Sequence, residues 1–324
     1  MRVTRRSRHA AGAVLAGFVL ALMIGVMEHA EAQAPLTLKV GVLPIIPMTP
    51  LRTAEKLGYF KEEGVELQLQ TFQGGAVALP ALLNKQVDIT YSNYVSVVQL
   101  AQQGGKLRVI AGGTSSWAKT PDAGSLLVGQ DSPVKSLRDL PGKTLALNTL
   151  RSIEHVSIKQ WLRNNGIDPN SVKYVEVPWV NQADAYKQGS IQVLSVIEPF
   201  QSRYVNQMGF RVVGYFYEAW KIGVPLAGWV VMQEWLNDKK DHARRFARAI
   251  ERAVQYLRQN PAEERKLMEE FFKLPKLVVD GIVLNDYTVK VNSAAAQILL
   301  DAMVEDGVLK AKVNFAELLH DTAR

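Results

Sequence analysis

Hydrophobic and polar residues alternate with a period of two over residues 36–42, and the same alternation returns over 65–69. This period is typical of strands that have one face against a core. Between them, apolar residues recur at helical spacing over 50–57. The pattern therefore predicts a β-α-β unit, whose crossover is right-handed and whose strands are parallel.

The turns of this unit are the first candidate ligand-binding positions. Open sheets of this kind bind ligands beyond the carboxyl ends of their strands. In this chain, that rule selects the turn from Pro44 to Thr49 after the first strand, which includes Met48, and the glycines Gly74 and Gly75 after the second. Thr49 is also predicted to be the N-cap of the following helix, ahead of a first-turn proline.

Short strands and helices continue to alternate along most of the chain. Strands are predicted at 87–91 and 107–111, and a second series follows at 125–128, 143–147, 172–177, 191–196, 210–217 and 226–232. After Trp235 the pattern is helical almost to the end of the chain. A helical tail without further βαβ units has to pack on a lobe that is already built.

The predicted fold class is therefore α/β with two lobes, each a mostly parallel sheet flanked by helices. We assign residues 36–114 together with 224–324 to lobe 1, and residues 115–223 to lobe 2. Two connections then cross between the lobes, which makes a hinge possible.

Residues 1–32 are predicted to be a secretory signal peptide. Basic residues precede an apolar run over 10–27, and Ala30 and Ala32 supply small residues for cleavage near Ala32. The alternative is an uncleaved membrane anchor, since the run is barely long enough to span a bilayer. We expect export to the periplasm of a double-membraned bacterium.

Composition excludes several classes of function. The formal net charge is +7, and no run of five basic residues is present, so nucleic acid is not expected as a partner. The chain has no cysteine, so it has no disulfides and no lipidated cysteine. Histidines are few and scattered, and the spacings of common hydrolase and nucleotide-binding motifs are absent. We therefore expect no metal, no cofactor and no catalytic residues.

Helix starts that follow strands are the remaining candidates. Ser92 and Asn93 follow one predicted strand, and Arg151 and Ser152 follow another. Unpaired N–H groups and peptide dipoles make helix N-termini attractive to anions. The Arg151 guanidinium could add a bidentate contact to a carboxylate or sulfonate. The alternative is that Arg151 is a surface residue and Ser152 only a cap.

Aromatic residues and one acid fall near the same turns. Trp117, Trp179 and Trp229 follow strand-like segments and could enclose an organic ligand. Each could instead belong to the core. Glu198 could accept a hydrogen bond from a ligand, or simply begin its helix.

Motifs along the chain resemble one known family. They are VGVLP, EKLGYFKEEGVEL, the GG turn, VD before a strand, GKTLALN, NNGIDPNSVKYVEVP and IEPF, in that order. Together they resemble the solute-binding proteins of nitrate/taurine-type (NitT/TauT) ABC transporters, a group that includes proteins similar to the yeast-type thiamine-pyrimidine synthase. The resemblance implies a two-lobed periplasmic binding protein of type II that closes on a small solute and delivers it to an inner-membrane permease. The chain departs from it at Gln192, where an acid is expected.

The expected function is capture of a small organic anion, a sulfonate or a carboxylate, by a monomeric transport protein that is not an enzyme. The first alternative is a thiamine-precursor pyrimidine, with Glu198 accepting from its amino group. A pyrimidine-synthase-like enzyme is a further alternative. The resemblance implies that this chemistry needs an active-site histidine and a cysteine-rich motif. The chain has no cysteine, and it has no histidine between Leu36 and Asn148. A ligand-sensing module on a membrane receptor is the third alternative.

Overall fold

The computed structural model describes residues 36–117 and 120–324. The predicted signal peptide and its cleavage near Ala32 lie outside the described residues. Within the described ranges, no helix combines the length and the apolar character needed to cross a bilayer.

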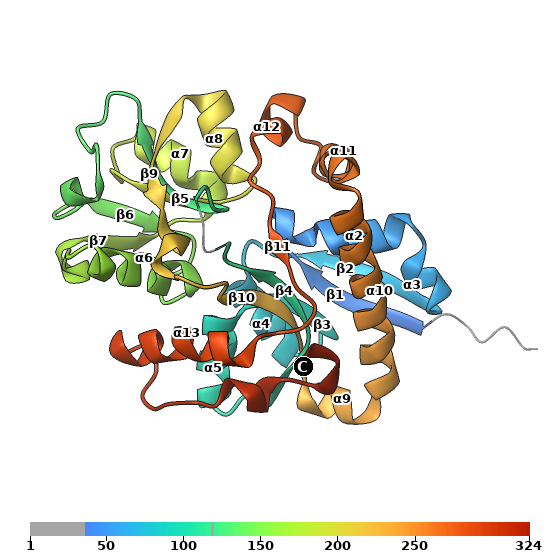
Figure 1. The fold of residues 1–324 in the computed structure, drawn as a ribbon. Coiled ribbons are helices and arrows are strands. Elements are labelled where there is room, and N and C mark those ends of the chain that lie inside the picture. Colours follow the sequence, from blue (N-terminus) through green and yellow to red (C-terminus); the bar gives the residue numbers. More distant parts are fainter. Residues whose placement is uncertain (1–35, 118–119) are drawn as a thin grey trace, which may run out of the picture. The chain divides into compact units, whose positions relative to one another are not determined.

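A six-stranded sheet contains the predicted opening unit (Figure 1). Its strand order is β11-β4-β10-β3-β1-β2. Strand β1 pairs in parallel with both β2 and β3. The bounds are β1 Leu36–Val42, β2 Val65–Thr71, β3 Ile89–Asn93, β4 Leu107–Ser115, β10 Pro225–Met232 and β11 Asp286–Tyr287.

Strand β10 makes this sheet mixed, which departs from the predicted mostly parallel arrangement. It lies between β3 and β4 and is antiparallel to both. The reason is topological. Strand β4 carries the chain out of the sheet and β10 brings it back, so the two strands run in opposite directions and pair as neighbours.

The strands between β4 and β10 form two smaller sheets. In the first, β5 (Gly124–Gly129) is antiparallel to both β8 (Leu194–Ile197) and β9 (Phe210–Tyr215). In the second, β6 (Thr144–Leu147) is parallel to β7 (Lys173–Glu176). A parallel bridge between Leu145 and Val193 links β6 to the segment that leads into β8.

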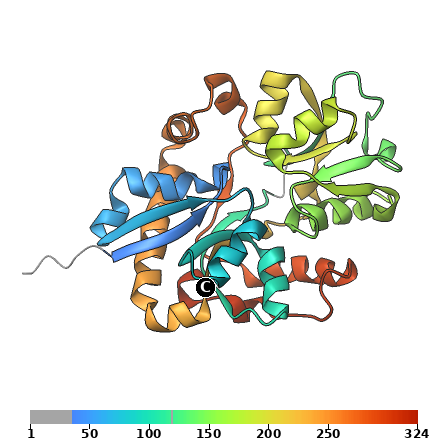
Figure 2. The same cartoon turned by 180° about the vertical axis from the view of Figure 1, so that it is seen from behind.

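Helices follow most of the strands, as the pattern predicts. Those that precede β10 are α2 Thr49–Lys56, α3 Tyr59–Glu62, α4 Gly75–Leu83, α5 Tyr94–Gln102, α6 Ile153–Asn164, α7 Trp179–Lys187 and α8 Phe200–Met208. Those of the tail are α9 Gln233–Asp238, α10 Lys240–Gln259, α11 Pro261–Phe272, α12 Lys276–Gly281 and α13 Ser293–Glu305. The view from behind in Figure 2 shows α6 to α8 beside the smaller sheets and the tail along the larger one.

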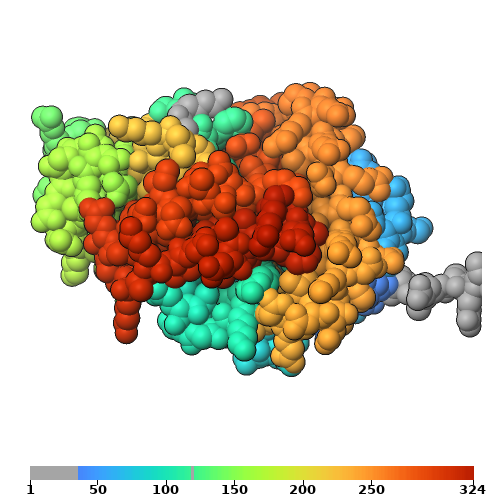
Figure 3. Space-filling model, turned by 60° about the horizontal axis from the view of Figure 1, so that its bottom comes forward, coloured from blue at the N-terminus to red at the C-terminus, as the bar shows by residue number. Residues whose placement is uncertain are grey.

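The tail packs on the six-stranded sheet through the apolar face of α10. The ring of Phe246 lies 5.5 Å from the ring of Phe60 and 5.2 Å from the ring of Trp229 in β10. At its far end, the tail covers one face of the molecule between α10 and the yellow-green region of α6 and α7 (Figure 3). The strands thus divide between the sheets as the two lobes require, while the lobe boundaries near residues 115 and 223 stay a prediction.

Helix α6 packs closely against the three-stranded sheet at Gly214, and this contact can be tested. A Cβ atom added to Gly214 of β9 would lie 2.4 Å from Cη2 of Trp161 in α6. Overpacking of this kind costs about 1–3 kcal/mol. Gly214→Ala should therefore lower the free energy of unfolding by about that amount in urea titrations.

The Trp161→Phe background provides the control, because its smaller ring makes room for the added methyl group. In that background, Gly214→Ala should cost much less than it does in the original chain. An equal cost in both backgrounds would contradict the proposed contact.

Candidate functional site

A cavity of about 70 Å³ lies where strands of the six-stranded sheet and strands of the two smaller sheets end. Leu43 follows β1 and Asn93 ends β3, while Asn148 follows β6 and Glu198 follows β8, and all four line the cavity. The site is therefore at the carboxyl ends of the strands, as expected for sheets of this kind.

Four helices begin at this cavity. Gly75 of α4, Asn93 as the N-cap of α5, Ser152 as the N-cap of α6, and Trp179 of α7 all line it. The first turn of a helix carries N–H groups without intrahelical acceptors. The cavity thus receives the positive ends of several peptide dipoles.

Two asparagines supply acceptors to these helix starts. The Asn93 side-chain oxygen accepts from Ser96 N of α5 at 3.0 Å and from Ile153 N of α6 at 3.3 Å. The Asn148 side-chain oxygen accepts from Trp179 N of α7 at 3.2 Å. Asn93 therefore connects a helix of the first sheet to a helix of the smaller sheets.

The paired glycines allow the close approach of these elements. A Cβ atom on Gly74 would lie 2.8 Å from Nδ2 of Asn148, and one on Gly75 would lie 2.7 Å from Cα of Ser92. Gly74 and Ser92 therefore lie next to residues that line the cavity. A larger side chain at Gly74 would collide with Asn148, and one at Gly75 would collide with Ser92.

Glu154 is a buried acid in the first turn of α6 that the sequence patterns did not single out. Its carboxylate accepts from Asn148 N at 2.9 Å, from Trp179 Nε1 at 3.2 Å and from the Ser195 hydroxyl. Burial raises the pKa of Glu154 from its ordinary 4.5 to about 7, although these donors oppose the shift. An acid in the first turn after a serine cap was the available signal.

Glu198 is a second buried acid and connects the smaller sheets to the tail. Its Oε1 accepts from Val283 N at 3.0 Å and from Ser202 Oγ at 2.9 Å, and its Oε2 accepts from Ser202 N at 3.2 Å. Burial raises the pKa of Glu198 to about 7, against the effect of these donors.

Two further polar atoms complete the lining. Ser152 Oγ and Asn285 Oδ1 belong to cavity-lining residues, are buried and have no hydrogen-bond partner within the described structure. The lining residues include two glutamates but no lysine or arginine. The lining therefore combines two buried carboxyl groups with an unpartnered hydroxyl and an unpartnered amide oxygen.

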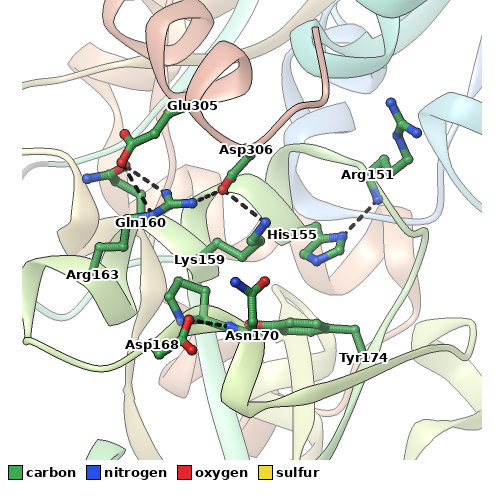
Figure 4. Close-up of polar contacts among 11 residues, drawn as sticks. Arg151, His155, Lys159, Gln160, Arg163, Asp168, Asn170, Tyr174, Glu305 and Asp306 are labelled. Carbon is green, nitrogen blue, oxygen red and sulfur yellow. Dashed lines mark hydrogen bonds and ion pairs between the residues drawn. The ribbon is translucent and has the colours of Figure 1, made fainter.

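Arg151 does not extend into this cavity. Its backbone is left-handed, with φ of 59°, and its backbone N donates to His155 Nδ1 at 3.0 Å. Its guanidinium donates to the Val308 carbonyl oxygen at 3.1 Å, beyond the end of α13. Figure 4 shows the Arg151 side chain pointing away from His155. Among the described residues, the cavity lining thus contains no guanidinium for the anion contact expected here.

Six other expected positions are also absent from the cavity lining: Gly74 and Ser92, which adjoin it, and the four that follow. Met48 lines a second hollow between α2, α8 and α11, which is described below as the outer groove. Thr49 is fully buried and its hydroxyl donates to Ile46 O at 2.7 Å, so it is not the N-cap of α2. Trp229 belongs to the core and packs edge-on against Tyr91. Trp117 donates through its backbone N to Asp122 and through its ring to Leu284 O.

Charges on α6 face the end of α13 (Figure 4). Lys159 Nζ lies 3.0 Å from Oδ1 of Asp306, and the Arg163 guanidinium contacts the same oxygen. Arg163 also pairs with Glu305 at 3.4 Å. The Asp306 side chain is fully buried. These contacts join the helix that carries Ser152 and Glu154 to the tail.

The pH dependence of stability should report the buried carboxyls. A group whose pKa is higher in the folded chain stabilises it fully below the unfolded pKa, here about 4.5, and loses that contribution as the pH rises through about 7. Glu154→Gln removes the titration, so the original chain should lose on the order of 3 kcal/mol more than the variant between pH 4.5 and pH 8.

Urea titrations at pH 5 and pH 8 measure this difference. Glu66→Gln, at an exposed position of β2, is the matched control and should behave like the original chain. If the difference between the original chain and Glu154→Gln is the same at both pH values, the raised pKa of Glu154 is wrong.

The Asp306 contacts generate a second test. Asp306→Asn leaves Lys159 and Arg163 facing each other without their shared carboxylate, so the contact between α6 and α13 should weaken. We expect a larger radius of gyration by X-ray scattering and a lower melting temperature. Asp301→Asn is the control, because Asp301 is half exposed and lies 3.9 Å from Lys312 within the tail. Equal effects of both substitutions would contradict the role of Asp306.

Comparison with known proteins identifies the family. Residues 46–264 match the family described as NMT1/THI5 like. A Bacillus subtilis protein, YtlA, provisionally named as a binding protein, is 25% identical over 66% of this chain, and the match spans 64% of its own length. Another Bacillus subtilis protein, provisionally named as binding aliphatic sulfonates, is 22% identical over 83% of this chain and 77% of its own.

Solved structures establish the fold. The alkanesulfonate-binding protein SsuA from Xanthomonas axonopodis pv. citri, bound to MOPS, superposes with a TM-score of 0.75 at 16% identity, covering 88% of this chain and 98% of its own. The periplasmic nitrate-binding protein NrtA from Synechocystis PCC 6803 gives 0.72 at 15% identity, covering 88% and 86%. The two-lobed periplasmic-binding-protein fold and the family resemblance predicted from the motifs are thus confirmed. The chain belongs to the NMT1/THI5-like family.

Proposed function

We propose that this protein is the substrate-binding component of an ABC importer, which captures a small solute between its two lobes and delivers it to a permease at the inner membrane. The observation that carries this proposal is the cavity at the carboxyl ends of strands from the six-stranded sheet and the two smaller sheets, where four helices begin. The names of the relatives, which describe binding of sulfonates or nitrate, support the same role.

The lining of the cavity favours a neutral solute that donates hydrogen bonds. Glu154, Glu198 and Asn285 line the cavity with acceptor groups. The Asn285 oxygen has no partner within the described chain, whereas the glutamate oxygens already accept from protein donors. The planar indole of Trp179 lines the same cavity and provides an apolar face. A pyrimidine with an exocyclic amino group has this chemistry.

An organic anion is the second candidate, and the four helix starts favour it. Their contribution is limited, at about 0.3–1 kcal/mol for each exposed helix terminus and up to about 2 kcal/mol when partly buried. An ionised carboxylate about 4 Å from a bound anion would cost about 4 kcal/mol at an effective dielectric constant of about 20. Binding of an anion would therefore require Glu154 and Glu198 to be protonated.

Transport fits the cavity better than catalysis does. No histidine is among its lining residues, and the nearby His155 faces Arg151 N and the ring of Tyr174. Burial, together with Lys159 and Arg151, lowers the pKa of His155 to about 4, so it would be a weak base. Export through a cleaved signal near Ala32, a periplasmic location and a monomeric state belong to the same proposal. A sensing role on a membrane receptor would use the same cavity.

A ligand screen tests both the role and the ligand class. We expect an aminopyrimidine to raise the melting temperature, because a solute that binds only the folded chain stabilises it. Its affinity by calorimetry should rise from pH 6 to pH 8 as Glu154 and Glu198 ionise. The affinity of a sulfonate or carboxylate should instead rise as the pH falls. Glu154→Gln should lower the affinity for the aminopyrimidine at pH 8, whereas Glu66→Gln should leave it unchanged.

Two outcomes would count against these proposals. If neither the screened solutes nor a small-molecule extract raises the melting temperature, solute binding is wrong. If an anion binds more tightly at pH 8 than at pH 6, the electrostatic account of the cavity is wrong.

A further inference from the structure

A second hollow of about 540 Å³ lies outside the cavity described above. One wall comes from the end of β1 and from α2, a second from α7 and α8, and a third from the end of α11. Figure 1 shows α2 and α11 on one side and α7 and α8 on the other. Leu43 lines both hollows, so this outer groove adjoins the cavity. The proposed solute does not require it.

The walls of the outer groove are largely apolar and aromatic. Phe200, Phe271 and Phe272 contribute their side chains to it. Phe200 is largely buried, whereas the other two are partly exposed. Such a surface can hold the planar or aliphatic body of a small organic molecule.

The charged residues of the groove are basic. Arg52 and Arg203 line it, and no acidic residue does. This is the reverse of the cavity, whose lining has two acids and no basic side chain. The two hollows therefore favour opposite charges.

Arg203 has the free guanidinium of the pair. Within the described residues, its side chain makes no hydrogen bond or ion pair, and only its backbone N donates, to Pro199 O at 3.0 Å. Arg52 is already engaged, since its Nη1 lies 2.8 Å from Oε2 of Glu55 and its guanidinium lies 6.0 Å from the Phe271 ring centre. Arg203 is thus the residue that can accept a new anionic partner.

We propose that the outer groove is a second binding site, for an organic anion with an aromatic or aliphatic body. The carboxylate or sulfonate forms two parallel hydrogen bonds with the Arg203 guanidinium. The body lies among the phenylalanine side chains. Because Arg203 and Phe200 lie on α8 while Phe271 lies on α11, the ligand contacts both sides of the groove at once and stabilises their contact.

Calorimetry with 2-naphthalenesulfonate tests this site. We expect saturable binding to the full chain, and at least about tenfold weaker binding to Arg203→Gln. The uncharged 2-naphthalenemethanol should bind more weakly than the sulfonate and should be insensitive to Arg203→Gln. Arg138→Gln is the matched control, because it removes the same charge at an exposed position outside the groove.

Glu154→Gln separates this site from the cavity. A sulfonate bound in the cavity should bind more tightly once the Glu154 charge is removed, whereas a sulfonate bound in the outer groove should still bind more weakly to Arg203→Gln. Melting curves of each variant without ligand confirm that it is folded. Three results would overturn the proposal: no saturable binding to the original chain, equal affinity in Arg203→Gln, or binding that changes in Glu154→Gln but not in Arg203→Gln. The solute-binding proposal has its own test, because it fails if neither the screened solutes nor the extract raises the melting temperature.

Discussion

The N–H groups at the starts of four helices need acceptors, and this need organises the cavity. Free backbone donors in a buried place are costly unless they are paired. Asn93 and Asn148 accept from helix starts, and Glu154 accepts from the backbone N of Asn148. Side chains chosen to satisfy the protein's own donors also line the space left for a ligand. The cavity consequently carries two buried carboxyl groups where the single guanidinium of Arg151 was expected.

The two hollows share a border but differ in charge. Two buried acids line the inner one and two arginines the outer one. Burial holds the pKa of both inner acids near neutrality, so small changes in pH alter the charge that a ligand meets there. A change of pH therefore changes the charge of the inner site.

The order of strands and helices was predictable from local patterns, because strand alternation and helix spacing are properties of short segments. The positions of Gly75, Asn93, Ser152 and Trp179 at the cavity followed from the rule on strand ends. The direction of Arg151 could not be foreseen, since its partner, the Val308 carbonyl, is 157 residues away. The same limit applies to Trp229, whose burial depends on Phe246 of the distant α10. The insertion of β10 between β3 and β4 is likewise a pairing between distant segments.

Leu43 follows the first strand of the larger sheet and forms part of the wall of both hollows. The Leu43 side chain therefore lies between the cavity, which two acids line, and the outer groove, which two arginines line. In a descendant with glycine or alanine at this position, the two spaces would tend to merge into one elongated compartment. Such a compartment would suit a dipolar molecule, with its donor end inside and its negative end outside. The range of nutrients open to this scaffold could thus widen through one small change in volume.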